Sequence, residues 1–198
     1  MKSVFALCAL GIAQPAFAGG PETGAVQNRL HTMHHEYDVA LGVLPMDAFT
    51  KGVTLSGSYT LHFNDLFAWE VAQFTYSFPV DTKLQAELAN LAQPVGPTPF
   101  EIVRYYGTSN FIFKPVYGKL SVLNRSVIYQ ELLFNAGLGV GRLTLTTRPV
   151  VDLGVAVRFY GKKGVSVRLD ARDYAFINGD GVENELWFGL GLSLGHGQ

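Results

Sequence analysis

The residues of this sequence that could do chemistry together are charged side chains placed at every second position of apolar segments. Carboxylates and guanidiniums that share one enclosed space can line an ion path or relay protons. They can also pair bidentately and fill that space. The two signs are nearly balanced, which favours mutual pairing and a filled interior. The set is Glu36, Asp38, Glu70, Arg104, Glu131, Asp152, Arg158, Arg168, Asp170 and Arg172.

Other reactive patterns are weaker. His31, His34 and His35 are close in sequence, but alternation along a strand sends the last two to opposite faces, and no carboxylate is fixed beside them. The glycines at 137, 139 and 141 imitate part of a dinucleotide-binding loop without its following helix. No serine or threonine stands in a spacing that pairs it with a histidine base. The sequence therefore predicts no catalytic residue, no metal site, no cofactor and no enzyme.

The overall charge excludes one class of partner. The chain has 198 residues, of which 15 are Lys or Arg and 16 are Asp or Glu. A basic face is the electrostatic footprint of a nucleic-acid-binding protein. No nucleic-acid partner is expected.

The segments that carry the charged set alternate between apolar and small or polar residues. This period of two is typical of strands whose two faces differ. The last segment sets one apolar row against Trp187, Gly189, Gly191 and Ser193. Its apolar row is Leu186, Phe188, Leu190, Leu192 and Leu194.

The character of the second face separates a soluble sheet from a membrane barrel. It mixes Gly, Ala and Ser with paired charges, which suits a narrow lumen, whereas a charge on the apolar face would cost roughly 2–4 kcal/mol at a bilayer midplane. An even number of strands closes an up-and-down barrel. The sequence predicts an all-β, eight-stranded antiparallel transmembrane barrel. The expected strands begin near 34, 53, 67, 103, 128, 151, 165 and 186, with a bulge near Gln73 in the third.

The connections predict an orientation, because short turns face the periplasm and long loops face outward in such barrels. Tight turns are expected at 64–65, 114–119 and 161–164, and longer links at 45–52, 79–99, 141–149 and 174–185. The 79–99 link is expected to carry a short helix and to contact a partner. Its candidate residues are Asp81, Leu84, Leu88 and Leu91.

The first residues indicate export. Lys2, an apolar run and the Ala16-Phe17-Ala18 sequence form a secretory signal peptide. The expected organisation is a signal peptide at 1–18, a periplasmic segment at 19–32 and an outer-membrane barrel at 33–195. The expected location is the outer membrane of a Gram-negative bacterium. The only cysteine, Cys8, lies in the signal peptide, so no disulfide is expected.

Six short segments of the sequence stand out together: LPMDAFTKG (44–52), WEVA (69–72), VDT (80–82), YGK (117–119), LNRS (123–126) and RLDARDY (168–174). In this order they resemble a family of small outer-membrane β-barrel domains found in myxobacteria and related bacteria. The resemblance implies an eight-stranded, OmpA-like barrel with no assigned activity. The resemblance also implies a candidate role, because some small barrels of this general kind look like parts of the envelope complex that drives myxobacterial gliding.

Three functions follow as hypotheses. The first is a structural or interaction subunit of the cell envelope, in a surface complex such as gliding-motility or adhesion machinery. The second is a narrow, porin-like passive channel, and the third is a barrel that binds a small ligand. The expected partners are outer-membrane lipid, envelope proteins and, during biogenesis, the barrel assembly machinery that would recognise the closing strand.

Overall fold

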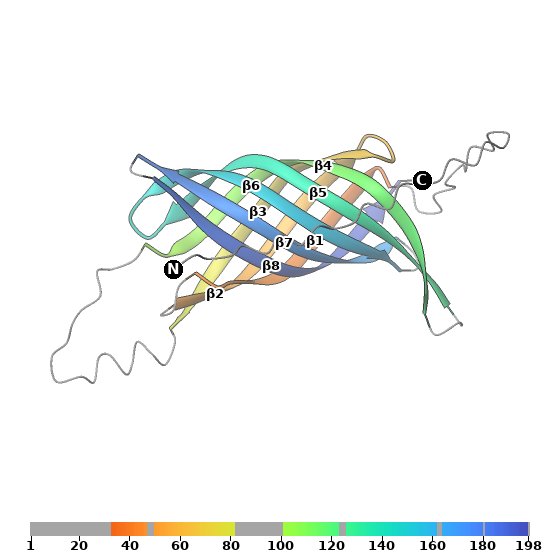
Figure 1. Ribbon diagram of the computed structural model, residues 1–198, viewed down its shortest axis with the longest axis horizontal. Helices are drawn as coiled ribbons and strands as arrows, with labels where there is room; N and C mark the ends of the chain where they lie inside the picture. The colour runs from red at the N-terminus through yellow and green to blue at the C-terminus, as the bar shows by residue number, and fades with distance from the viewer. Residues whose placement is uncertain are drawn as a thin grey trace, which may run out of the picture.

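The chain forms one closed sheet of eight strands in sequence order (Figure 1). The computed structural model describes residues 33–46, 50–81, 101–122, 126–161, 164–179 and 181–197. The strands are β1 (His35–Leu44), β2 (Thr50–His62), β3 (Phe67–Asp81), β4 (Val103–Val122), β5 (Ser126–Leu143), β6 (Thr147–Tyr160), β7 (Val165–Asn178) and β8 (Gly181–His196). The predicted all-β, eight-stranded antiparallel barrel is confirmed.

Every strand pairs antiparallel with its neighbours, and the last closes against the first. His35 lies opposite His196, and Val43 lies opposite Phe188 at the other end of the β1–β8 ladder. Closure leaves no sheet edge along this seam. Both ends of the barrel chain therefore lie at the same end of the barrel, together with the β2–β3, β4–β5 and β6–β7 connections.

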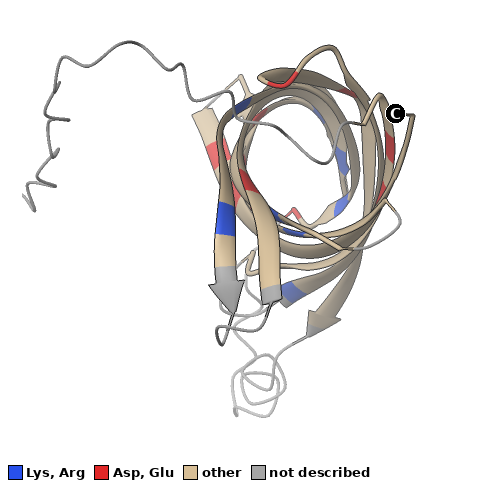
Figure 2. Ribbon diagram, turned by 90° about the vertical axis from the view of Figure 1, so that its right-hand side faces the viewer, with Lys and Arg blue, Asp and Glu red and all other residues tan. Residues whose placement is uncertain are grey.

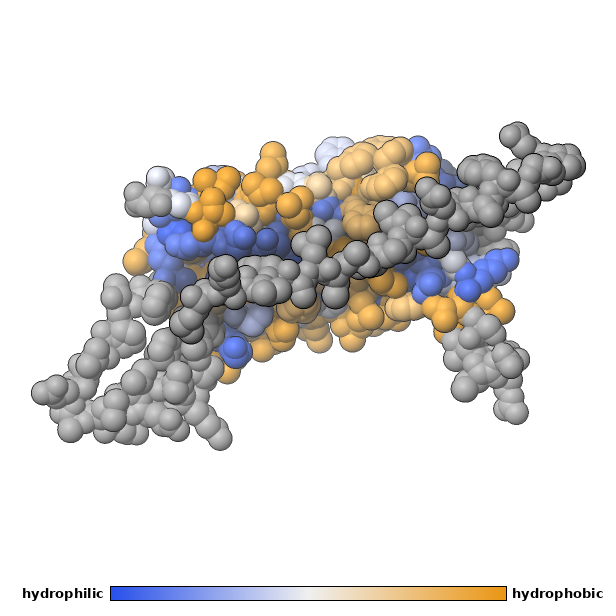
Figure 3. All heavy atoms as spheres, in the orientation of Figure 1, coloured by the Kyte–Doolittle hydropathy of each residue, from blue (hydrophilic) through white to orange (hydrophobic). Residues whose placement is uncertain are grey.

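Alternation along each strand sends side chains to two different environments. In β1 the odd-numbered side chains are exposed and the even-numbered ones are buried. The exposed side chains form an apolar surface over much of the barrel, which Figure 3 shows in orange. Figure 2 shows the strands as a ring around the barrel axis. The polar parity of the sequence is thus the inner face.

Bulges interrupt this alternation at three places. The register of β3 against β4 shifts between Glu70 and Gln73, which confirms the bulge predicted there. Two further shifts lie in β4 against β5, one between Val103 and Tyr105 and one between Phe113 and Val116. A bulge inserts one residue into a strand, so it exchanges the inner and outer parities beyond it.

Several strands are longer than the sequence indicated. The turn expected at 114–119 is wrong, because β4 continues to Val122 and pairs there with Ser126 of β5. The long links expected at 141–149 and 174–185 are also wrong, because their residues extend the ladders to Arg142 opposite Thr147 and to Asn178 opposite Gly181. Polar rim residues hid these extensions, since strand ends in water need no apolar alternation.

The remaining expectations concern residues outside the described part. The signal peptide, the 19–32 segment and the loop helix with Leu84, Leu88 and Leu91 all lie there, as does the side chain of Asp81. Every regular element in the described ranges is a strand. No helix among those residues is long and apolar enough to cross a membrane.

Candidate functional site

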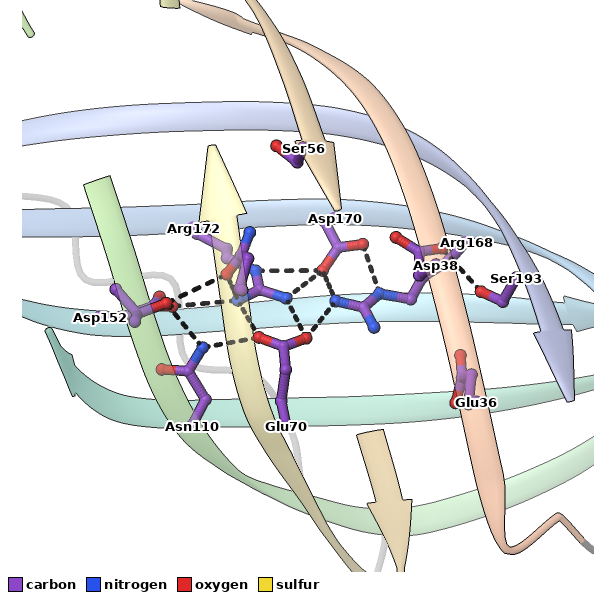
Figure 4. Close-up of polar contacts among 12 residues, drawn as sticks. Glu36, Asp38, Ser56, Glu70, Asn110, Asp152, Arg168, Asp170, Arg172 and Ser193 are labelled. Atoms are coloured by element: carbon purple, nitrogen blue, oxygen red, sulfur yellow. Dashed lines mark hydrogen bonds and ion pairs between the residues drawn. The ribbon is translucent and has the colours of Figure 1, made fainter. Parts of the chain in front are cut away.

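The candidate site is the charged interior of the barrel, and β7 supplies its centre. Alternation points Arg168, Asp170 and Arg172 inward from this strand, and all three are buried. Figure 4 shows them beside Glu70 of β3 and Asp152 of β6. We call these five residues, with Asn110 of β4, the central cluster.

Arg172 makes the largest number of ion pairs in the central cluster. Its Nη1 lies 2.9 Å from Glu70 Oε1 and 3.0 Å from Asp152 Oδ2, and its Nη2 lies 3.1 Å from Glu70 Oε2. Its Nε and Nη2 both donate to Asp170 Oδ1 at 3.2 Å. The planar guanidinium can satisfy several carboxylates at once because its five N–H groups point in fixed directions.

Arg168 completes the pairing of the same carboxylates. Its Nε donates to Asp170 Oδ2 at 2.6 Å and its Nη2 donates to Asp170 Oδ1 at 2.9 Å. A third bond runs from Nη2 to Glu70 Oε2 at 3.2 Å. Glu70 therefore accepts from both arginines of β7.

Neutral side chains extend the central cluster around the lumen. Asn110 Nδ2 donates to Glu70 Oε1 at 2.7 Å. Arg172 Nη1 also donates to Gln73 Oε1, at 2.5 Å, and Thr108 donates to the same amide oxygen at 3.2 Å. The network thus joins β3, β4, β6 and β7.

Asp38 lies next to this cluster, on β1. Ser193 of β8 donates to Asp38 Oδ2 at 2.7 Å across the closing seam. A Cβ atom on Gly191 would lie 2.6 Å from the same oxygen, so the glycine makes the room that the carboxylate occupies.

A second group of charges lies nearer the end of the barrel that holds both termini. Arg158 Nη2 donates to Glu36 Oε1 at 2.6 Å and Oε2 at 2.7 Å, and all three residues Glu36, Glu131 and Arg158 are buried. Arg158 Nη1 lies 3.3 Å from Glu131 Oε2, to which Tyr160 donates at 2.7 Å. We call Glu36, Glu131 and Arg158, with His62 and Lys114, the terminal cluster.

His62 connects Glu36 to Lys114 in the terminal cluster. Its Nδ1 lies 3.0 Å from Lys114 Nζ, and its Nε2 lies 2.7 Å from Glu36 Oε2. An ammonium group only donates, so Nδ1 accepts and Nε2 carries the proton donated to Glu36. The hydrogen bonds therefore select one neutral tautomer of His62.

An apolar core lies in the half of the lumen away from the termini. It contains Ala40, Leu44, Val103, Tyr106, Leu143, Val150, Tyr174, Phe176 and Trp187. Trp187 donates from Nε1 to Thr54 Oγ1 at 2.7 Å, so its polar atom is satisfied inside the barrel. A Cβ on Gly42 would lie 2.5 Å from Trp187 Nε1, which shows how closely the indole fills this level.

A group of polar contacts around Arg148 lies beyond the apolar core. Arg148 pairs with Glu101 at 2.7 Å and with Glu183 at 2.6 Å. Thr146 donates to Glu101 Oε2 at 2.7 Å. The carboxylates of these pairs come from segments that flank the barrel mouth opposite the termini.

One predicted lumen residue is wrong. Arg104 is exposed, because the bulge between Val103 and Tyr105 turns Val103 into the lumen and Arg104 outward. The other nine members of the set have buried side chains.

Two residues of the terminal cluster were not in the predicted set. Lys114 is only 4% exposed and was assigned to a turn. A signal was present, since Lys114 follows Phe111 and Phe113 on the opposite parity. His62 carried the same signal, because it alternates with the apolar Leu61 and Phe63.

The apolar row of β8 lies on the outside of the barrel. Leu186, Phe188, Leu190, Leu192 and Leu194 are 48–61% exposed. Trp187 and Ser193, on the other parity, are buried. The outer surface also carries a shallow apolar groove of about 560 Å³ between Phe63, Trp69, Phe111 and Leu138.

The balance of charge limits what the interior can do. The buried charged side chains in the described part are six acids (Glu36, Asp38, Glu70, Glu131, Asp152 and Asp170) and five bases (Lys114, Arg148, Arg158, Arg168 and Arg172). Opposite charges in contact neutralise one another and fill the bore with paired side chains. No group of three or more His, Cys, Asp or Glu residues in the described ranges is arranged to hold a metal ion.

Fold and interior together define a class: a small closed β-barrel with an apolar outer surface and a lumen filled by ion pairs and aromatic rings. No family model and no curated protein matches the sequence. The chain is similar to the crystal structure of Neisserial surface protein A (NspA), with 11% identity and a TM-score of 0.45 over 82% of this chain and 96% of that one. It is also similar to the backbone structure of the Yersinia pestis outer membrane protein Ail in a phospholipid bilayer nanodisc, with 14% identity and a TM-score of 0.36 over 80% of this chain and 99% of that one.

Proposed function

We propose that this chain is a non-enzymatic outer-membrane barrel of a Gram-negative bacterium that serves as a structural or interaction subunit of the cell envelope. The observation that carries the proposal is the separation of chemistry between the two faces of the barrel. Charged side chains are paired inside, and large apolar side chains cover the outside.

The outer surface supports a lipid environment. Leu41 of β1, Leu138 of β5 and Leu192 of β8 are each more than 60% exposed. Soluble monomers rarely expose contiguous apolar patches larger than a few hundred Å². Strands of 10–20 residues are also long enough, because a tilted strand crosses a bilayer in about 9–11 residues.

The filled lumen supports a scaffold over a channel. The apolar core around Trp187, the central cluster and the terminal cluster follow one another along the barrel axis. An ion would have to separate buried pairs to pass, and breaking such a pair costs about 3–5 kcal/mol. We therefore expect no steady conductance.

The topology supports an orientation with the start of β1 and the end of β8 on the periplasmic side. The signal-like first residues favour export, and the longest connection, 82–102, leaves the opposite end of the barrel. Long loops face outward in barrels of this kind. This outer loop, with Leu84, Leu88 and Leu91 in its sequence and Asp81 just before it at the end of β3, is thus one candidate contact for an envelope protein.

The expected setting follows from these features. Outer-membrane lipid surrounds the barrel, and the barrel assembly machinery inserts it. The family resemblance adds a gliding-motility complex as one candidate assembly, and adhesion machinery is the other surface assembly that we consider.

The deciding experiment measures insertion and conductance on one refolded sample. We expect the mature chain to insert into phospholipid vesicles, where the folded barrel should be protected from protease. In a planar bilayer the same protein should produce no ionic current. Regular current steps from folded protein would favour the channel. Recovery of the mature protein in the soluble periplasmic fraction would overturn the membrane assignment.

A second experiment tests the outer loop. A variant with residues 84–98 replaced by a short Gly-Ser linker should still fold and insert. Loss of co-purifying envelope proteins from detergent-extracted membranes would support the loop as a contact, whereas undiminished co-purification would exclude it.

A further inference from the structure

The β4–β5 hairpin projects beyond the rest of the barrel. These are the longest strands, with 20 and 18 residues. Figure 1 shows their green ends extending past the other strands at one end of the barrel. We call residues 116–130 the projecting hairpin. The neighbouring connections at this end are short, so this projection is a distinct feature of the fold.

Sheet pairing explains why one side of the projecting hairpin is open. β3 begins at Phe67, opposite Phe113, and the Lys114 N–H donates to the Leu66 carbonyl at 2.7 Å. From Val116 to Val122, β4 pairs with β5 alone within the described part of the chain. This stretch is on the order of 20 Å long at about 3.3 Å per residue. Such an edge is a template to which an extended peptide can add as a strand.

Aromatic contacts hold the projecting hairpin against the barrel. The ring of Tyr117 lies 5.9 Å from that of Tyr129 and 5.9 Å from that of Tyr160 on β6. A backbone edge that is already ordered loses little conformational entropy when a partner binds. The edge is therefore preorganised.

Lysine side chains often guard exposed edges, but Lys119 is turned away from this one. Its Nζ lies 5.5 Å from the centre of the Tyr129 ring, on the β5 side of the hairpin. The ammonium thus contributes positive charge without covering the outer edge of β4.

The chemistry of the projecting hairpin indicates what would bind. Val116 and Leu120 are 50% and 41% exposed, on the same face of β4. The sequence of the projecting hairpin contains Lys119 and Arg125 and no Asp or Glu. An extended segment with apolar residues at alternate positions and acidic residues at its ends would complement both properties.

We propose that the open edge of β4 from Val116 to Val122 is a docking site for an extended acidic segment of another envelope protein, which adds to the barrel as an antiparallel strand. This proposal depends on the proposed function in one respect, namely the cell compartment in which the barrel meets its partner. It names a surface at the end of the barrel opposite the outer loop.

The test uses the full mature chain refolded in detergent and two synthetic peptides, ETVTVTVTE and KTVTVTVTK. We expect the glutamate-ended peptide to bind at least tenfold more tightly than the lysine-ended one in fluorescence anisotropy titrations. Binding should slow hydrogen exchange of backbone amides between 116 and 122. Amides in the matching span of β8, from Leu186 to Leu194, should be unaffected.

Matched variants locate the site. Replacing residues 119–129 by Asn-Gly ends the hairpin at the Gly118–Gln130 pair and should abolish binding while the barrel still folds. Lys119→Glu should lower the affinity for the glutamate-ended peptide about threefold or more, which is the effect expected for the loss of one exposed ion pair. Lys51→Glu makes the same charge change on β2 and should leave binding unchanged.

Three results would overturn the proposal. The first is that the variant with the shortened hairpin binds the glutamate-ended peptide as tightly as the parent does. The second is that the folded protein binds neither peptide. The third is that the parent forms a dimer and the shortened variant does not, which would assign the edge to a second copy of the chain. A barrel that inserts silently but binds no peptide contradicts this inference alone. A barrel that binds the peptide but does not insert contradicts the proposed function alone.

Discussion

Glu70 and Arg172 face each other across the lumen through two parallel bonds, Nη1 to Oε1 at 2.9 Å and Nη2 to Oε2 at 3.1 Å. They belong to β3 and β7, which are not neighbours in the sheet. The pair therefore braces two opposite parts of the barrel wall in addition to the backbone ladders. Breaking this pair should therefore lower the free energy of unfolding of the barrel by an amount that can be measured.

Removing Arg172 should destabilise the barrel strongly. Arg172→Met leaves the buried carboxylates of Glu70, Asp152 and Asp170 with fewer positive partners. Breaking a buried pair in this way costs about 3–5 kcal/mol. Urea unfolding of the protein in phospholipid vesicles, followed by tryptophan fluorescence, measures the loss.

The control for this prediction removes both partners. Glu70→Met with Arg172→Met should be more stable than Arg172→Met alone, because the unpaired carboxylate is gone. Arg142→Met, which loses a hydrogen bond to Thr147 at the rim, should change stability by less than about 1 kcal/mol. A double variant no more stable than the single one would contradict the brace.

Two arginines of the predicted set should behave differently because one lies inside and one outside. Arg158→Ala leaves Glu36 and Glu131 buried beside an empty space, and we expect a loss of about 3–5 kcal/mol. Arg104→Ala removes an exposed side chain and should stay within about 0.5 kcal/mol of the parent. Chemical denaturation of both variants under the same conditions measures the two losses in the free energy of unfolding. Equal losses would indicate that Arg104 lies in the lumen.

Two glycines test how tightly Trp187 fills the lumen. An added methyl group on Gly42 would lie 2.5 Å from Trp187 Nε1 and 2.7 Å from the Phe188 carbonyl oxygen, so Gly42→Ala should cost about 1–3 kcal/mol. Gly57→Ala meets nothing closer than 3.9 Å and should be neutral or slightly stabilising. Unfolding midpoints measured side by side check the contrast. A neutral Gly42→Ala would show that the indole has room to move.

The apolar row of β8 offers a depth test of the proposed bilayer. Leu190→Arg places a charge near the middle of the strand and should cost about 2–4 kcal/mol in vesicles, whereas Leu194→Arg, near the strand end, should cost about 0–1 kcal/mol. In a detergent micelle the difference should shrink, since the micelle deforms around the charge. Equal costs at both positions in vesicles would argue against a bilayer around β8.

Alternation was sufficient to predict the faces of most strands. In β1 and β8 the sequence pattern predicted both the exposed leucines and the buried residues Asp38 and Ser193, because side chains of a regular strand must point to opposite sides. The same rule failed in β4. The bulge between Val103 and Tyr105 adds a residue that no local pattern marks, so Arg104 was assigned inward.

The sequence by itself determined the architecture: strands with unlike faces, even in number, and a set of charges that only an enclosed space could accommodate. Only the tertiary structure decided which charges meet. Glu70 and Arg172 are 102 residues apart, and their contact depends on how barrel closure sets the two strands opposite each other. The part of the β4–β5 hairpin that lies beyond its neighbours was likewise decided by where β3 begins and β6 ends, which is a property of neighbouring strands and not of the hairpin's own residues.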